Sequence, residues 1–263
     1  MIGRRPIVSA ALAAAAAQMA TLQPAEAQPA PVPPPAPLTI TMLVHPDMVM
    51  LDLVGPLTVF GMLGATIHLV WHRLEPVSTD VGQLVMPTAS FATAPAVSDV
   101  LFVPGGLRGS IAMMEDSETL RFLALAGATA GYVTSVCTGA LVLGAAGLLR
   151  DYRATTHWYV RDLLPRFGAI PAEGRVVADR NRLTGGGVTA GLDFGLALAA
   201  MLRGEEAARR IQLLLEYDPQ PPFAAGSPTG AGQLLTADVL RRRAAALGAA
   251  GDAAGRAAAR LGI

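Results

Sequence analysis

The chain has 263 residues, of which 20 are basic and 20 acidic, so its formal net charge at pH 7 is +0. This balance argues against a nucleic-acid-binding protein that relies on a broad basic surface. Hydrophobic residues make up 52% of the chain, which permits a large core and argues against global disorder. The single cysteine excludes an intramolecular disulfide and a cysteine-based zinc cluster.

The N-terminal residues have the pattern of an export signal. Arg4-Arg5 supplies the charge, residues 7–22 are alanine-rich and mildly apolar, and Ala-Glu-Ala at 25–27 fits a small-x-small cleavage site. The paired arginines favour the twin-arginine route, so we expect residues 1–27 to direct the protein to the periplasm. A disordered tail or a misplaced start codon is the alternative, and the protein would then be cytoplasmic. The stretch is too short to be a stable membrane anchor.

Composition divides the rest of the chain into three parts. Residues 28–37 are rich in proline and alanine, which predicts an extended linker. Residues 38–228 have the alternating apolar patterns of a folded domain. Residues 229–263 are rich in alanine and arginine and predict a C-terminal helical extension, broken near Gly248 and Gly251.

Short apolar strands alternate with helices in the domain, and this order predicts a mostly parallel sheet covered on both faces. The expected strands are 38–44, 66–74, 99–103, 132–136 and 182–184. The expected helices are 56–63, 120–128, 139–149, 158–167, 190–202 and 205–215. Functional sites of such sheets lie at the carboxyl ends of the strands, so we expect the residues after 103, 136 and 184 to share one pocket.

Cys137 follows the β-branched stretch 132–136 and precedes a helical stretch of small residues. This pattern predicts a strand-to-helix elbow with the sulfur at the bend. Such a turn makes the sulfur accessible and places it at a helix N-terminus, where free N–H groups and the helix dipole favour the thiolate. The alternative is a buried apolar cysteine.

Asp52 and Thr138 are candidate partners of the thiol. Asp52 lies between Leu51 and Leu53, where burial of a carboxylate without a partner is costly. It is either a first-turn or N-cap acid of a helix or a carboxyl that shares a proton with the thiol or a substrate. Thr138 offers a hydroxyl and a backbone N–H next to the sulfur, or it caps the helix that follows.

Gly105, Gly106 and His157 are candidates for substrate binding. The glycine pair follows a strand and lets the backbone bring N–H groups close to a ligand, although it also suits a simple tight turn. His157 follows the helix after the cysteine and is either a substrate contact or a structural histidine. Arg241–Arg243 is expected to be a solvated helical face and not a binding patch.

These residues together resemble the DJ-1/PfpI (ThiJ) superfamily, and within it the isonitrile hydratase group. The resemblance covers about residues 38–228, and its matching stretches are 51–56, 103–106, 132–149, 153–158, 183–194 and 215–228. The block around Cys137 is also shared by the sensing domains of AraC-type regulators, whereas the stretch 215–228 is more specific to the hydratase group.

The resemblance implies a flavodoxin-like three-layer α/β sandwich that hydrates an isonitrile to an N-substituted formamide through a cysteine thioimidate. Cys137 is then the nucleophile, Asp52 the acid–base carboxyl and Thr138 an assisting residue, with Gly105, Gly106 and His157 at the substrate. It implies a small-molecule substrate, a homodimer, and no bound metal or organic cofactor.

Three other functions remain open at this stage: a non-catalytic ligand-sensing domain, a redox-responsive thiol protein and a glyoxalase-type enzyme. Residues 229–263 are too few for the two DNA-binding units of an AraC-type regulator. The protease and DJ-1 branches typically carry histidine where this chain has Thr138, which counts against a peptidase and, less strongly, against a glyoxalase.

Overall fold

Seven strands form the central sheet of the described part of the chain, residues 36–263 of a computed structural model. Their order is β10 (Val176–Asp179), β11 (Arg182–Gly185), β7 (Tyr132–Ser135), β6 (Val100–Val103), β1 (Thr39–Leu43), β2 (Thr66–Trp71) and β5 (Ala89–Ser90). All neighbouring strands are parallel except the hairpin β10–β11. The sheet is therefore mostly parallel, as predicted.

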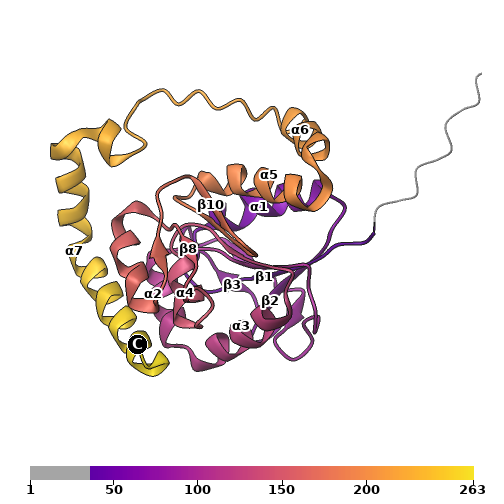
Figure 1. The fold of residues 1–263 in the computed structure, drawn as a ribbon, viewed down its shortest axis with the longest axis horizontal. Coiled ribbons are helices and arrows are strands. Elements are labelled where there is room, and N and C mark those ends of the chain that lie inside the picture. Colours follow the sequence, from indigo (N-terminus) through magenta and orange to yellow (C-terminus); the bar gives the residue numbers. More distant parts are fainter. Residues whose placement is uncertain (1–35) are drawn as a thin grey trace, which may run out of the picture. The chain divides into compact units, whose positions relative to one another are not determined.

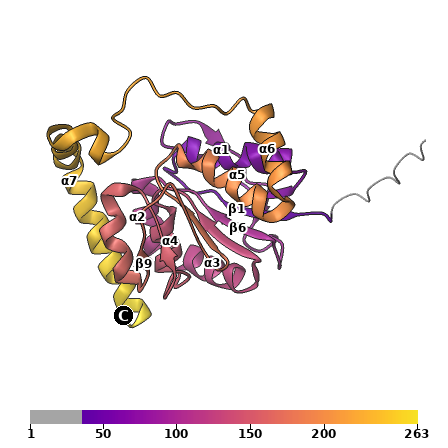
Figure 2. The ribbon, with the colours of Figure 1, turned by 45° about the horizontal axis from the view of Figure 1, so that its top comes forward.

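Helices cover both faces of the sheet (Figures 1 and 2). One face carries α1 (Met50–Met62) and α5 (Ala190–Arg203), with α6 (Glu205–Leu214) beside α5. The other carries α2 (Leu107–Glu115), α3 (Ser117–Thr129), α4 (Gly139–Ala145), the 3₁₀ helix η1 (Trp158–Phe167) and α7 (Pro228–Leu261). Two short ladders, β3 (Val77–Ser78) with β4 (Leu84–Val85) and β8 (Arg153–Ala154) with β9 (Ile170–Pro171), flank the sheet. This is the predicted three-layer α/β sandwich.

The alternation of side chains along buried strands explains the two layers. In β6, Val100 and Phe102 join the apolar cluster under α1 and α5, whereas Leu101 and Val103 join the cluster under the helices of the opposite face. Successive residues of a strand point to opposite faces, so a continuous apolar run such as this one is what a sheet buried on both sides requires.

Helix α1 begins at Met50, six residues before the predicted start, and Pro56 lies inside it. The N–H of Met50 donates to the Asp80 carboxylate at 2.9 Å. Asp80 is distant from Met50 in sequence, so the start of the helix could not be predicted from the capping residues next to it. The earlier start places Asp52 in the first turn of the helix.

The C-terminal extension, α7, is helical as predicted, but its two helical parts meet at a kink at Gly232, and the helix is continuous through the predicted breaks at Gly248 and Gly251. Four alanines hold its second half in place because they are fully buried against α2, α4 and η1: Ala250, Ala253, Ala254 and Ala257. Tertiary packing therefore outweighs the low helix propensity of the two glycines.

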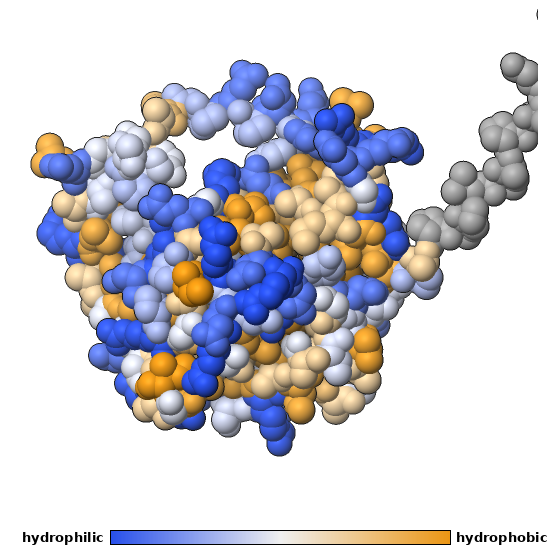
Figure 3. All heavy atoms as spheres, viewed as in Figure 1, coloured by the Kyte–Doolittle hydropathy of each residue, from blue (hydrophilic) through white to orange (hydrophobic). Residues whose placement is uncertain are grey.

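The segment between α6 and α7 is exposed from residue 218 to residue 227 and arches away from the helices and the sheet (Figures 1 and 3). Phe223 is 79% exposed there. None of the helices in residues 36–263 combines the length and the apolar character needed to cross a lipid bilayer. The predicted export signal, residues 1–27, lies outside the described residues.

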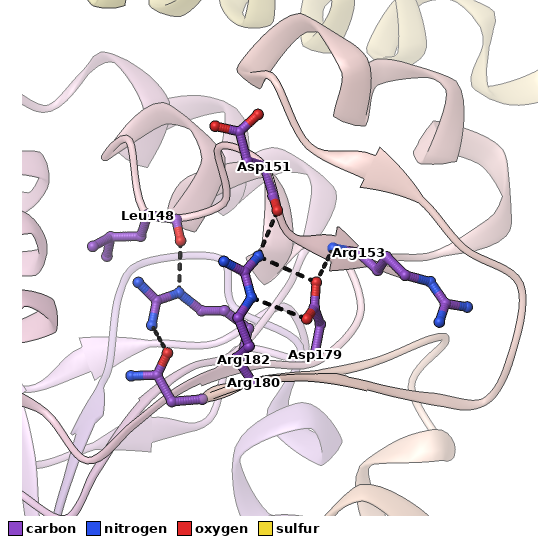
Figure 4. Close-up of polar contacts among 7 residues, drawn as sticks. Leu148, Asp151, Arg153, Asp179, Arg180 and Arg182 are labelled. Carbon is purple, nitrogen blue, oxygen red and sulfur yellow. Dashed lines mark hydrogen bonds and ion pairs between the residues drawn. The ribbon is translucent and has the colours of Figure 1, made fainter.

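A cluster of arginines ties the β10–β11 hairpin to its surroundings (Figure 4). The buried Arg182 donates from Nε to the carbonyl of Leu148 at 2.7 Å, and Arg180 pairs with Asp179 at 3.1 Å. Both guanidinium groups lie over the ring of Tyr152, at 3.6 Å for Arg180 and 4.4 Å for Arg182. These contacts fix β11, the strand next to the cysteine strand.

Candidate active site

Cys137 lies between the end of β7 at Ser135 and the start of α4 at Gly139, which confirms the predicted elbow. Its backbone φ is 53°, in the left-handed region that side-chain-bearing residues rarely adopt. Its N–H donates to the Gly185 carbonyl at 3.1 Å, and its carbonyl accepts from Thr156 Oγ1 at 2.7 Å. Gly185 at the end of β11 and Thr156 in the loop after β8 therefore hold the strained turn.

Gly105 allows the turn after β6 to approach the elbow closely. A Cβ atom at this position would lie 2.7 Å from Asp52 Oδ2 and 2.8 Å from Cys137 Cβ, inside van der Waals contact. Only glycine fits between the carboxyl and the cysteine, so this backbone segment brings α1 and the elbow together.

Asp52 is fully buried and faces the thiol. The N–H of Gly105 donates to its Oδ2 at 3.0 Å, and its Oδ1 has no hydrogen-bond partner among the described residues. Burial raises the pKa of Asp52 to about 7, against the opposing effect of hydrogen bonds from the Cys137 thiol and Gly105. Asp52 therefore combines the two alternatives offered by the sequence, because it is a first-turn acid of α1 and its carboxyl also faces the thiol.

Cys137 is only 2% exposed, and its pKa is raised well above the usual value by burial first and by the Asp52 carboxylate second. The N–H groups of Thr138 and Gly106 act in the opposite direction but do not outweigh these effects. The N–H groups at the start of the helix thus favour the thiolate, as expected, but burial and the Asp52 carboxylate keep the thiol protonated. The thiol and the carboxyl titrate as a coupled pair.

Thr138 does not cap the helix that follows, because its hydroxyl makes no such hydrogen bond. Its Oγ1 accepts from the Gly106 N–H at 2.9 Å and lies 2.8 Å from the hydroxyl of Ser110. Thr138 thus fixes the β6–α2 turn. Both predicted glycine donors have protein partners: Gly105 supports the carboxyl and not a substrate, while Gly106 faces Thr138 and the sulfur.

A cavity of about 450 Å³ opens at the thiol. Its lining residues come from several segments: Asp47, Val49, Asp80, Gly106, Leu107, Arg108, Cys137, His157, Tyr159, Val188 and Arg243. His157 lies here, as predicted. Its Nδ1 is buried without a partner among the described residues. Burial, with the charges of Arg243 and Arg161, lowers the pKa of His157 to about 4, so the imidazole is neutral at pH 7.

Tyr159 and Arg243 belong to the site and were not found from the sequence. The ring of Tyr159 lies against that of His157 with centroids 3.7 Å apart. Burial raises the pKa of Tyr159 to about 12, so its hydroxyl stays a donor at neutral pH. Arg241, Arg242 and Arg243 are all exposed, which confirms the predicted solvated face. Arg241 and Arg242 pair with Asp238, whereas Arg243 also lines the cavity, which the sequence did not indicate.

Comparisons with known proteins agree with this geometry. A sequence profile of the DJ-1/PfpI family matches residues 38–201. The isonitrile hydratase of Pseudomonas putida is 49% identical over 227 residues, 86% of this chain and 99% of that protein. The HTH-type transcriptional regulator GbdR of Pseudomonas aeruginosa is 30% identical over 69% of this chain, which spans about half (51%) of the regulator. The crystal structure of a ThiJ/PfpI family protein from Pseudomonas syringae superposes with a TM-score of 0.81 at 52% identity, covering 83% of this chain and 90% of that one.

Proposed function

The chain belongs to the DJ-1/PfpI family, and on this premise we propose that it is an isonitrile hydratase, a lyase that adds water to an isonitrile to give an N-substituted formamide. The observation that carries the proposal is the buried pair of Cys137 and Asp52, a thiol in contact with a carboxyl of raised pKa. The Pseudomonas putida enzyme, similar along nearly its whole length, supports the choice of reaction.

The first half of the reaction uses the shared proton. Asp52 accepts the proton of the Cys137 thiol, and the sulfur attacks the terminal carbon of R–N≡C. That carbon takes the proton back from Asp52, which gives the thioimidate R–N=CH–S–Cys137. An isonitrile carbon becomes electrophilic only when it is protonated or its developing charge is stabilised, so the acid and the nucleophile must act at the same atom.

The second half releases the product. Water adds to the thioimidate carbon, and Asp52 accepts one of its protons and delivers that proton to the nitrogen. The tetrahedral adduct R–NH–CH(OH)–S–Cys137 then collapses: its hydroxyl proton passes to Asp52, the C–S bond breaks to leave R–NH–CHO, and the expelled Cys137 thiolate takes the proton from Asp52. The overall change is addition of one water molecule, and the pair returns to its starting state. In this proposal the neutral His157 and the hydroxyl of Tyr159, which line the cavity, hold that water.

The experiment that tests this function compares three reactions of the protein that begins at Gln28. We expect formamide formation from cyclohexyl isocyanide, with little conversion of methylglyoxal to lactate and slow modification of Cys137 by hydrogen peroxide. The buried, protonated thiol is the reason for the slow oxidation. Fast oxidation or lactate formation without formamide formation would move the assignment to a redox-responsive or glyoxalase-type protein.

We also propose that the protein acts as a homodimer, which is supported by exposed apolar side chains at the α6–α7 segment. Leu213 is 81% exposed, Phe223 79% and Leu234 90%. These three side chains lie on α6, on the segment that follows it and at the start of α7, and large apolar side chains left exposed in this way are candidates for a protein interface. Sedimentation of the purified protein tests this: Phe223→Glu is expected to give monomers, and a monomeric wild type would contradict the proposal.

Periplasmic location is a proposal of the same kind, supported by the sequence of residues 1–27 alone. Fractionation of a Gram-negative host followed by N-terminal sequencing is expected to show a periplasmic chain that begins at Gln28. Replacement of Arg4-Arg5 by two lysines is expected to leave the protein in the cytoplasm. A full-length cytoplasmic wild type would contradict the export signal.

A further inference from the structure

Arg243 is a charged residue of the cavity that the hydration mechanism does not use. It comes from α7, more than one hundred residues after the cysteine, and lines the cavity that opens at the Cys137 thiol. Its guanidinium lies 5.5 Å from the centre of the Tyr159 ring. The Arg243 side chain is exposed to solvent, and its charge lowers the pKa of His157, which lines the same cavity.

The charges that face Arg243 across the cavity are already engaged. Arg108 pairs with Asp47 at 3.3 Å, and Asp80 accepts from the N–H of Met50 at the N-terminus of α1. Arg241 and Arg242, next to Arg243 on the same helix, pair with Asp238. Within the part of the chain that the structure describes, no ion pair involves Arg243, so this guanidinium is available to a ligand.

A second chamber adjoins the first at Arg243. It has a volume of about 280 Å³, and the two cavities share His157, Tyr159 and Arg243. The second chamber adds apolar side chains, among them Trp158, Leu235 and Val239. A molecule with its reactive end at Cys137 would therefore meet a cation on the way and an apolar space beyond it.

We propose that Arg243 anchors an anionic group of the substrate, so that the preferred substrates of this site are isonitriles that carry a carboxylate beside an apolar substituent. This inference rests on the proposed hydratase function and specifies its substrate class. A planar guanidinium binds a carboxylate with two parallel hydrogen bonds, which fixes orientation as well as position. An anchored carboxylate would hold the isonitrile carbon at the sulfur.

A matched pair of substrates tests the anchor. Isocyanoacetate carries a carboxylate, and methyl isocyanoacetate is its neutral ester. We expect Arg243→Gln to lower the ratio of kcat/KM for the anion to kcat/KM for the ester roughly tenfold, the size of a partly exposed charge-assisted contact. Arg242→Gln is the control, because it removes the same charge from the same helix outside the cavity. An unchanged ratio in Arg243→Gln would overturn the proposal.

Alkylation of the thiol separates this proposal from the hydratase function. Cys137 is the only cysteine, so its rates of reaction with iodoacetate and iodoacetamide can be read by intact mass. We expect Arg243→Gln to lower the ratio of the iodoacetate rate to the iodoacetamide rate about tenfold, and Arg242→Gln to leave it unchanged. If this ratio falls while no isonitrile is hydrated, the anion site stands and the hydratase function fails. If isonitriles are hydrated and neither ratio changes, the function stands and the anchor is wrong.

Discussion

Asp52 and Cys137 form a buried, coupled pair that determines how the site titrates, and in the proposed reaction one proton passes between them. Burial raises both pKa values, to about 7 for the carboxyl and well above the usual value for the thiol. The reactive state holds a single proton, because the sulfur must lose a proton that the carboxyl then delivers to carbon. Between the two pKa values the pair is in this state.

The pH dependence of kcat/KM follows from this proton count. We expect kcat/KM to rise with pH as the first proton leaves the pair, with an apparent pKa near 7, and to fall again only at alkaline pH. Asp52→Asn should lose this acidic limb and at least about 100-fold in kcat/KM, the usual contribution of a positioned acid. Initial rates of formamide formation measured across pH test this, after subtraction of the acid-catalysed background. A variant with a full rate and an unchanged limb would remove Asp52 from the mechanism.

Folding stability should show the cost of the same carboxyl. The folded-state pKa of Asp52 lies above that of an unfolded aspartate. The free energy of unfolding is therefore expected to fall as pH rises from about 4 to about 7, because the buried carboxyl must then lose its proton. Asp52→Asn is therefore expected to be more stable than wild type at pH 8, by up to about 4 kcal/mol, and equal to it below pH 4. Urea unfolding of Cys137→Ala with and without Asp52→Asn, at pH 4 and pH 8, measures this without the thiol. A lower free energy of unfolding at pH 8 in the variant that carries Asp52→Asn would contradict the conclusion that burial of the charged carboxylate destabilises the protein.

At the scale of elements, the elbow depends on close backbone packing at the start of α4. A Cβ atom at Gly139 would lie 2.8 Å from the Pro104 carbonyl oxygen and would also clash with the carbonyl oxygen of Val103. Both are backbone atoms of the β6 end, so no side chain can move aside to relieve the contact.

Gly139→Ala is accordingly expected to lower the free energy of unfolding by more than about 2 kcal/mol and to reduce activity. Gly248→Ala, in the middle of α7 with no atom within 4 Å of the added methyl, should instead stabilise the protein by about 0.5–1 kcal/mol. Thermal unfolding of the two variants gives the comparison. Equal effects of the two substitutions would show that the elbow tolerates a side chain there.

Most of the sheet could be predicted from short apolar runs, but several helix boundaries could not. The start of α1 depends on Asp80, and α7 remains continuous through Gly248 because buried alanines pack on three other elements. Helix α2 was not predicted at all. The 3₁₀ form of η1 was also missed; Pro165, which lies inside it, cannot donate a backbone hydrogen bond. These features could not be predicted for two reasons. Some depend on a contact with a residue distant in sequence, and others depend on a backbone conformation that gives the same hydrophobic spacing as an α-helix.

At the scale of the whole molecule, α7 connects packing to the substrate cavity. Its second half is anchored by buried alanines, and its first half carries Arg243 into the site. The sequence could not show this, because Arg241, Arg242 and Arg243 look alike until the fold places Tyr159 beneath one of them. Cys137, Asp52 and Thr138, which carry local motifs, could be found.

Displacement of α7 should therefore affect activity as well as stability. Ala254 is fully buried, so Ala254→Arg is expected to detach the helix and to lower both the melting temperature and the turnover of isonitriles. Ala244→Arg adds the same side chain at an exposed position of the same helix and should change neither. Thermal unfolding and formamide assays on the two proteins test the connection, and wild-type turnover by a folded Ala254→Arg protein would contradict it.

Attack of Cys137 on the isonitrile carbon is tested most directly by the mass of the protein during turnover. Rapid acid quench of wild type with cyclohexyl isocyanide, read by intact mass, is expected to show a transient adduct of one isonitrile on Cys137 that decays as formamide appears. Cys137→Ala should show neither adduct nor product above background, a loss of at least about 1,000-fold. Formamide formation by Cys137→Ala at the wild-type rate would contradict the account.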